Sequence, residues 1–234
     1  MMKIKSISQI LLGLLLGLSL LSEAATDASQ PSVQVAYFHK LKKEKFTNQI
    51  KSYFDQNKSC KSCELIDRTP YKESGDVDES KLANEISTLG PEFQIIFINW
   101  NEKASESNQQ LIEALAKKSV QGALILFTAG APLNDEPTIA LNKTIAGQIP
   151  EAVIVGEMTE RERLLPNLFY GPEMLTAIKL SKEFSGQGLA PVYFVSKWVS
   201  QWFKRKPTEW VSFMKLKKNK VRKLWLGIED FFPR

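Results

Sequence analysis

The chain has 234 residues, a formal net charge of +5 and 43% hydrophobic residues, with two cysteines and a single histidine. Its length suits one compact α/β domain with a single core. The mild basicity comes without a basic repeat, so it does not indicate a nucleic-acid partner. Two cysteines and one histidine cannot supply the four ligands of a structural zinc site, and we expect neither a metal nor a cofactor.

Residues 1–24 have the composition of a secretory signal peptide. Lys3 and Lys5 precede an apolar run at 10–21, and the small residue Ala24 marks the expected cleavage site. The run is too short to span a bilayer comfortably, although an uncleaved anchor is the alternative. We therefore expect an exported protein that is periplasmic or secreted.

The first elements expected after this segment are a strand and a charged helix. Residues 33–38 alternate and then become apolar, which is typical of a strand. His39 follows directly, and we expect it to be a solvated loop residue, as a lone histidine at a strand end commonly is. Residues 41–57 repeat large apolar side chains every four positions, which predicts a helix with one buried face.

Cys60 and Cys63 follow this helix and precede a short expected strand at 64–67. A thioredoxin-like redox site would place its cysteine pair after a strand and at the start of a helix, which is the reverse order. An exported chain with two cysteines favours a structural disulfide over redox chemistry.

Helices and strands alternate through the middle of the chain. A helix is expected at 78–89, an apolar strand at 93–99, a helix at 105–118 and a second apolar strand at 122–131. This alternation predicts a three-layer α/β fold with a mostly parallel sheet and helices on both faces.

Sheets of this kind bind ligands beyond the carboxyl ends of their strands. In this chain those ends carry His39, Asp67, Asn99, Trp100, Asn101 and residues 128–131. Asn99, Trp100 and Asn101 are therefore candidate binding residues for a protein or peptide partner, whose identity the sequence does not give.

The last third of the chain predicts two helices. Residues 190–202 carry aromatic and aliphatic side chains at four-residue spacing, which is typical of a central buried helix. A second helix starts at Pro207, and six cations follow between 215 and 223 with aromatic residues nearby. This basic helix could touch an anionic membrane surface, although a solvated face on a docked helix is the simpler interpretation.

Four segments in order resemble motifs of subtilisin-like serine proteases. Residues 186–191 resemble the Gly-Thr-Ser-Met-Ala-x-Pro motif at the start of a buried helix, with one residue deleted. Residues 122–131 resemble the strand that ends in Ala-Ala-Gly-Asn, and 147–156 and 169–173 resemble the following strand and Gly-Pro-Glu turn. The resemblance covers residues 77–202 and implies a subtilisin-like fold.

The family's catalytic positions are degenerate in this chain. The resemblance places Gly188 at the serine position, Ala131 at the oxyanion asparagine and His39 at the end of the strand that carries the catalytic aspartate. The Gly-x-Gly-Thr-His motif is absent, and residues 174–185 replace a much longer substrate-framing segment. A serine-protease triad needs a serine, a histidine base and a carboxylate, so we assign no catalytic residues.

A non-standard nucleophile and base remain an alternative. Ser185 and Ser196 flank the degenerate serine motif, and Lys182 or Lys197 could serve as the base of a serine-lysine pair. This arrangement would make the protein an atypical serine peptidase or hydrolase.

We therefore predict a signal peptide at 1–24, a subtilase-like α/β domain at 25–206 and a basic C-terminal helical extension at 207–234. The leading hypothesis is an exported, catalytically inactive subtilase-like protein with a binding or structural role. Gly171 and Glu173, in the Gly-Pro-Glu turn, join the candidate binding residues. An atypical hydrolase and an envelope-associated structural protein are the alternatives.

Overall fold

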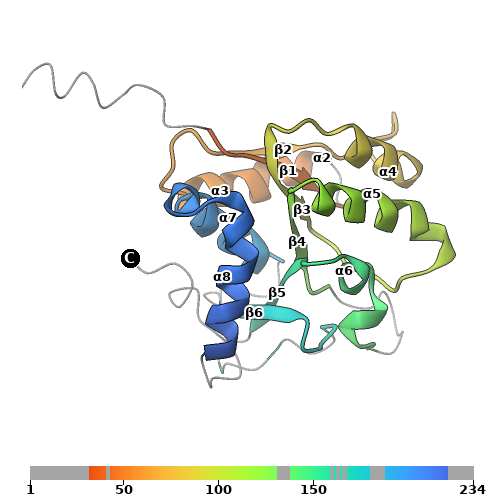
Figure 1. The fold of residues 1–234 in the computed structure, drawn as a ribbon. Coiled ribbons are helices and arrows are strands. Elements are labelled where there is room, and N and C mark those ends of the chain that lie inside the picture. The colour runs from red at the N-terminus through yellow and green to blue at the C-terminus, as the bar shows by residue number, and fades with distance from the viewer. Residues whose placement is uncertain are drawn as a thin grey trace, which may run out of the picture. The chain divides into compact units, whose positions relative to one another are not determined.

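The computed structural model of the chain describes residues 32–40, 43–130, 138–158, 161, 164, 168–179 and 188–220 (Figure 1), apart from the side chains at 43, 46, 47, 207 and 215–220. From Val33 onward the described residues belong to one compact unit. The predicted signal peptide, Ala131 and the part of the serine motif before Gly188 lie outside the described residues, so those predictions remain predictions.

Six parallel strands form one sheet at the centre of this unit. The strands are β1 (Gln34–Phe38), β2 (Glu64–Asp67), β3 (Phe93–Ile98), β4 (Leu124–Thr128), β5 (Val153–Met158) and β6 (Met174–Lys179). Their order across the sheet is β2-β1-β3-β4-β5-β6, and every neighbouring pair is parallel. The predicted α/β class with a parallel sheet is confirmed.

The central strands are apolar along their length because the sheet is covered on both faces. Ile95 pairs with Leu124 and Ile98 with Phe127, and successive side chains alternate between two separate hydrophobic cores. A strand that is buried on both faces has no polar face to alternate with, so it is a continuous apolar run in the sequence.

The first core lies between the sheet and the helices that begin and end the domain. These elements are the π-helical η2 (Phe46–Lys51), which follows the short α2 (Lys43–Lys45), then α3 (Ser52–Asn57), α7 (Ala190–Val199), the 3-10 turn η5 (Trp202–Lys204) and α8 (Pro207–Lys220). Trp198 is fully buried, and its ring lies 5.9 Å from that of Trp202 and 6.1 Å from that of Trp210. The predicted buried aromatic helix is thus confirmed, and the first half of α8 packs in the same core.

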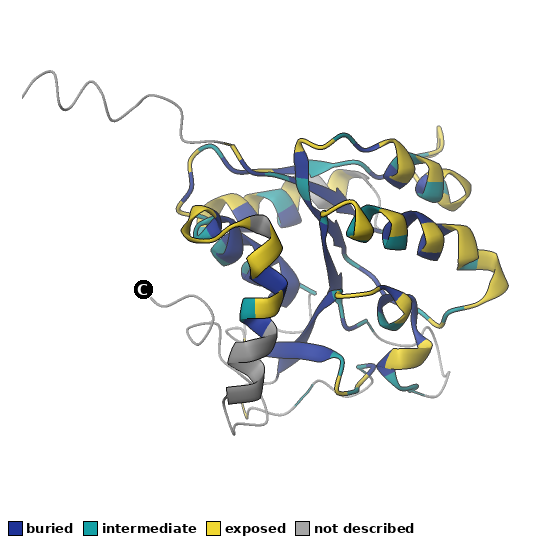
Figure 2. Ribbon diagram, viewed as in Figure 1, coloured by how far each residue is buried: buried dark blue, intermediate teal, exposed yellow. Residues whose placement is uncertain are grey.

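The second core lies on the opposite face of the sheet. It is covered by α4 (Glu79–Thr88), α5 (Gln109–Val120) and α6 (Ile145–Gln148), together with the 3-10 turns η3 (Glu106–Asn108) and η4 (Leu141–Lys143). Figure 2 shows that α4 and α5 are buried where they face the sheet and exposed on their outer sides. This one-sided burial follows from their apolar stripes, such as Leu111 and Leu115 on α5.

Three local features differ from the sequence prediction. Strand β6 follows the Gly-Pro-Glu turn directly, at a position for which the sequence predicts no element. Residues 141–148 form η4 and α6, which were also not predicted. The helix expected at 41–57 is divided, because η2 has π-helical bonding before α3 begins. The turn at 141–148 is too short for periodicity to reveal it, and a π-helical stretch cannot be told from an α-helix by the spacing of apolar residues.

The strand order reverses once, between β1 and β3. From β1 the chain passes through α3 on the first face to β2, whereas from β3 it passes through α5 on the opposite face to β4. In open parallel sheets, a crevice forms beyond the carboxyl ends of two strands whose connections leave in opposite directions. The carboxyl ends of β1 and β3 are therefore the first place to look for a functional site.

Candidate functional site

The carboxyl edge of the sheet brings together polar side chains from three strands. His39 directly follows β1, Asp67 ends β2 and Asn99 directly follows β3. The register places Tyr37 opposite Asp67 and Phe38 opposite Ile98, so the three strands end at about the same level. The carboxyl ends of these parallel strands therefore lie together at one edge of the sheet, as the sequence analysis expected.

His39, Asp67 and Tyr71 form a hydrogen-bonded group, here called the His39 cluster. The Tyr71 hydroxyl donates to Asp67 Oδ2 at 2.6 Å, and its oxygen lies 2.9 Å from His39 Nε2. A phenol has one proton, and Tyr71 gives it to Asp67, so His39 Nε2 must be the donor to Tyr71. The imidazole therefore carries a proton on Nε2, which also lies 3.5 Å from Asp67 Oδ2.

The loop after β2 covers His39. The backbone N–H of His39 donates to Thr69 Oγ1 at 3.1 Å, and the backbone N–H of Thr69 donates to Asp67 Oδ1 at 2.9 Å. His39 is 0% exposed, so the expectation of a solvated loop residue is wrong. A buried imidazole must be hydrogen-bonded, and the Tyr71 hydroxyl is its partner, while Thr69 holds the backbone N–H of His39.

Asp67 carries a negative charge in the cluster, and Tyr71 and the neighbouring Tyr37 are neutral phenols. Burial by itself raises the pKa of Asp67, but hydrogen bonds from His39, Tyr71 and Thr69 outweigh it and hold the pKa below its ordinary value. Burial raises the pKa of Tyr71 well above its usual range, and the neighbouring Asp67 raises it further. Burial likewise raises the pKa of Tyr37, so both hydroxyls remain protonated at neutral pH.

Asn99 extends the cluster to β3. Its side-chain amide nitrogen donates to the Tyr37 hydroxyl at 2.5 Å, and the Tyr37 ring lies 5.2 Å from the His39 ring. Asn99 is half-buried, which leaves part of this candidate binding residue at the surface.

Lys40 and Trp100 lie beside each other at the same edge. Lys40 Nζ lies 2.8 Å from a Glu102 carboxylate oxygen, 3.2 Å from a Glu79 carboxylate oxygen and 5.6 Å from the centre of the Trp100 ring. Trp100 is buried in the second core, and its indole nitrogen has no hydrogen-bond partner within the described part of the chain. The sequence did not identify Lys40, since its partners are distant and it follows no motif.

Asn101 is an internal connector. Its side-chain nitrogen donates to Ala129 O and Thr144 Oγ1, both at 3.0 Å, and its side-chain oxygen accepts from Ala146 N and Glu102 N, both at 3.1 Å. The residue is 4% exposed. These bonds use the whole amide to join the ends of β3 and β4 to α6, so Asn101 has no polar group left for a ligand.

The Gly-Pro-Glu turn lies next to the end of β4. Phe169 N donates to Gly130 O at 3.1 Å, and Met174 N donates to Gly171 O at 3.2 Å. A Cβ at Gly171 would collide with the Glu173 carboxylate. Glu173 Oε2 is buried without a hydrogen-bond partner in the described residues. A binding role for Gly171 and Glu173 remains a prediction.

Gly188 lies just before Leu189, the residue that caps the start of α7. The φ of Gly188 is 69°, in the left-handed region that favours glycine, and a Cβ there would meet no atom within 4 Å. Two of the alternative catalytic side chains have structural contacts instead. Ser196 is buried and donates to Tyr193 O at 2.7 Å, while Lys197 Nζ donates to Asn57 O at 2.7 Å. Ser185 and Lys182 lie outside the described residues.

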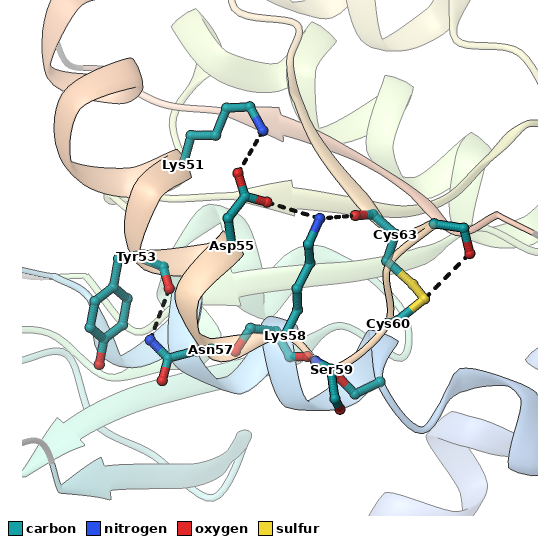
Figure 3. Close-up of polar contacts among 11 residues, drawn as sticks. Lys51, Tyr53, Asp55, Asn57, Lys58, Ser59, Cys60 and Cys63 are labelled. Atoms are coloured by element: carbon teal, nitrogen blue, oxygen red, sulfur yellow. Dashed lines mark hydrogen bonds and ion pairs between the residues drawn. A yellow bond between two sulfur atoms is a disulfide. The ribbon is translucent and has the colours of Figure 1, made fainter.

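Cys60 and Cys63 form a disulfide, which Figure 3 shows with its surrounding contacts. Lys58 Nζ donates to Cys63 O at 2.5 Å and lies 2.9 Å from Asp55 Oδ1. The loop also docks on the end of α7, since Ser59 N donates to Ser200 Oγ at 2.8 Å. Both cysteines are buried and neither begins a helix, as expected for a structural disulfide.

Metal binding and membrane spanning find no support in the part of the chain that the structure describes. No three histidine, cysteine, aspartate or glutamate side chains gather there as a metal site. None of the helices in that part is both long enough and apolar enough to cross a bilayer.

Comparison with known proteins gives matches in fold only. No family model and no curated protein matches the sequence. A cold-adapted subtilisin-like serine proteinase is 12% identical with a TM-score of 0.57, over 82% of this chain and 84% of its own. The prenylagaramide maturation protease PagA is 13% identical with a TM-score of 0.57, over 91% of this chain and 96% of its own.

A protease from Pseudoalteromonas arctica also matches, at 13% identity and a TM-score of 0.50, over 69% of this chain and 57% of its own. Identities this low establish a shared architecture and nothing about activity. With its parallel sheet and two helical layers, the chain therefore has a subtilisin-like α/β fold, as the sequence resemblance implied.

Proposed function

We propose that this chain is an exported, catalytically inactive protein that uses a subtilisin-like scaffold for a binding or structural role. The observation that carries the proposal is the hydrogen bonding of His39, which stands where the sequence resemblance places the catalytic aspartate. A serine-protease triad uses an imidazole nitrogen to accept the proton of a serine hydroxyl. In the His39 cluster, Nε2 is instead a donor to Tyr71.

Burial of the imidazole supports the same conclusion. His39 is enclosed by Tyr71, Thr69 and Tyr37, so a substrate could reach its ring only after these contacts open. A buried imidazole whose hydrogen bonds are made within the protein stabilises the fold, as buried polar networks do. We therefore interpret the His39 cluster as the structural replacement of a catalytic centre.

The residue at the resembled serine position adds a second line of support. Gly188 has no side chain that could attack a carbonyl carbon, and its positive φ disfavours any residue with a Cβ. A chain without nucleophile and base retains at most the weak acceleration that binding alone provides.

A serine-reactive fluorophosphonate probe tests the proposal directly. The folded chain starting at Ala25 should remain unlabelled under conditions in which an active subtilisin is labelled completely. A heat-denatured sample serves as the control for non-specific reaction. Labelling of the folded protein that disappears on denaturation would show an activated nucleophile and overturn the proposal.

An atypical hydrolase is the second candidate, and one contact favours it. His39 lies beside Asp67, which is the pairing of imidazole and carboxylate that orients a catalytic base. If the probe labels the folded protein, Ser185→Ala should abolish labelling when Ser185 is the nucleophile. Ser196→Ala is the matched comparison, because Ser196 is buried in α7.

Export is tested separately from inactivity. Expression of the full chain in a bacterial host and fractionation of the cells should place the protein outside the cytoplasm. Its mass should correspond to loss of residues 1–24. Recovery of the uncleaved chain from the cytoplasm would contradict export.

A further inference from the structure

The turn between α7 and α8 combines an exposed aromatic residue with three exposed cations. Phe203 is 49% exposed, and Lys204, Arg205 and Lys206 follow it in an exposed stretch that Figure 2 shows leading into α8. We propose that this basic turn, residues 203–206, binds the surface of an anionic phospholipid membrane. The inference is independent of whether the protein is catalytically active.

The positive charge of the basic turn is not neutralised by neighbouring carboxylates. In the part of the chain that the structure describes, neither Lys204 nor Lys206 is ion-paired through its side chain. Arg205 places its guanidinium 3.5 Å from the centre of the Phe213 ring. Glu209 lies close by, but its carboxylate accepts from the backbone N–H of Lys206 at 3.4 Å. The cations therefore remain available to an external anion.

The base of the turn is held rigidly by aromatic packing. The Trp202 and Trp210 rings are stacked with their centres 6.2 Å apart, and Trp210 Nε1 donates to Trp202 O at 3.2 Å. Both indoles are buried, whereas Phe203, directly next to Trp202, is half exposed. The turn thus exposes the Phe203 ring next to three cations, with the packed indoles of Trp202 and Trp210 at its base.

Anionic lipid is the partner that matches both components. Lysine and arginine are attracted to the negative surface of such a membrane, and an aromatic ring enters the boundary between headgroups and acyl chains. A nucleic acid would satisfy the charges, but it is not favoured for a chain with an expected signal peptide. An acidic protein would match the cations without a role for the exposed Phe203 ring, and the test below distinguishes it from lipid.

The neighbouring segments have the same sign of charge. The disulfide loop docks on Ser200, three residues before Phe203, and carries the exposed Lys61. Residues 210–220 of α8 contain four lysines and no acidic residue. The sequence from Phe203 to Lys220 is therefore predominantly basic, with Glu209 as its single acidic residue.

Co-sedimentation with lipid vesicles tests this inference. The protein should start at Ala25, because the apolar run at 10–21 would itself insert into lipid, while all described residues are retained. We expect binding to vesicles of phosphatidylcholine with about 30% phosphatidylserine. Binding should be weak on phosphatidylcholine alone and lost at about 1 M salt, where screening reduces the Debye length to about 3 Å.

Variants of the turn should identify the binding residues. Lys204→Glu with Lys206→Glu should lower the partition constant at least about twenty-five-fold, since each of the two lost cations contributes about a factor of five near an anionic surface. Phe203→Ser should lower it severalfold without removing the salt dependence. Thermal unfolding of each variant checks that the fold is retained.

Two control variants separate the turn from general properties of the protein. Lys72→Glu with Lys117→Glu changes the net charge equally at other exposed positions, and Val120→Ser removes an 84% exposed side chain on the opposite face of the sheet. Both should bind as the wild type does. Absence of binding, equal binding to uncharged vesicles or an equal loss in the control pair would overturn the inference. Binding of RNA or an acidic peptide without vesicle binding would also overturn it.

Discussion

Asp67 is the charged residue of the His39 cluster, and its replacement by asparagine should destabilise the fold. The carboxylate accepts from the Tyr71 hydroxyl and the backbone N–H of Thr69, and a lost hydrogen bond to a charged group costs about 2 kcal/mol. We expect Asp67→Asn to lower the free energy of unfolding by about that amount at pH 7. Urea unfolding measures it.

The pH dependence of the same variant has a defined sign. The folded pKa of Asp67 is below its ordinary value, so its ionised form contributes stability above the unfolded pKa of about 3.9. That contribution is lost as pH falls through the folded pKa. The difference between wild type and Asp67→Asn should therefore be full at pH 7 and shrink below about pH 4. A difference that stays constant would contradict the carboxylate's role.

Two glycines with the same backbone strain should respond differently to alanine. Gly130 and Gly188 have φ of 72° and 69°, and an L-residue in this region costs about 1–2 kcal/mol. A Cβ at Gly188 meets open space, whereas at Gly130 it would lie 2.7 Å from Asn101 O. Gly188→Ala should cost about 1 kcal/mol and Gly130→Ala clearly more, as measured by chemical denaturation. Equal costs would show that the clash at Gly130 relaxes freely.

For individual residues, the sequence predicted where they lie in the sheet better than it predicted how buried they are or what their side chains contact. Apolar runs located the ends of β1, β2 and β3, so His39, Asp67 and Asn99 could be placed at one edge. The burial of His39 depends on Thr69 and Tyr71, which are about thirty residues away in a polar loop. Asn101 was predicted to bind a partner, but its hydrogen bonds to β4 and α6 depend on tertiary contacts that no local pattern encodes.

Among the elements, the junction of β3, β4 and α6 depends on Asn101. Asn101→Ala would leave the backbone groups of Ala129 and Ala146 without this buried partner, and each unsatisfied group costs about 1–3 kcal/mol. We expect a loss of about 3 kcal/mol in the free energy of unfolding. Asn99→Ala, which removes one bond of a half-buried residue, should cost about 1 kcal/mol. Denaturation with urea compares the two, and equal losses would contradict the connector role.

Among the elements, the apolar runs of the central strands and the helical stripes of α4, α5 and α7 were predictable, whereas β6 and segment 141–148 were not. Segment 141–148 owes its shape to Thr144, whose side chain accepts from Gly147 N at the start of α6 and bonds to Asn101. Strand β6 is stabilised by its pairing with β5, which only the folded sheet provides.

The whole domain should unfold as one unit, because a single sheet separates its two cores. Trp198 is fully buried in the first core, and Trp198→Ala should cost about 4 kcal/mol. Unfolding in guanidinium should remain a single transition with an unchanged slope, followed by far-UV circular dichroism and tryptophan fluorescence. Phe203→Ala is the control and should change stability by no more than about 0.5 kcal/mol. Separate transitions for the two probes would indicate that the cores unfold independently.

The position of β1 in the sheet has a consequence for the order in which the chain folds. Strand β1 is synthesised first, but it lies second from the edge and pairs with β2 on one side and β3 on the other. Strands β4, β5 and β6 then add in the order of synthesis. Closing the long segment between β1 and β3 loses chain entropy before the pairing compensates for it. The arrival of β3 should therefore set the folding rate, and until then β1 keeps an open edge that can pair with another chain.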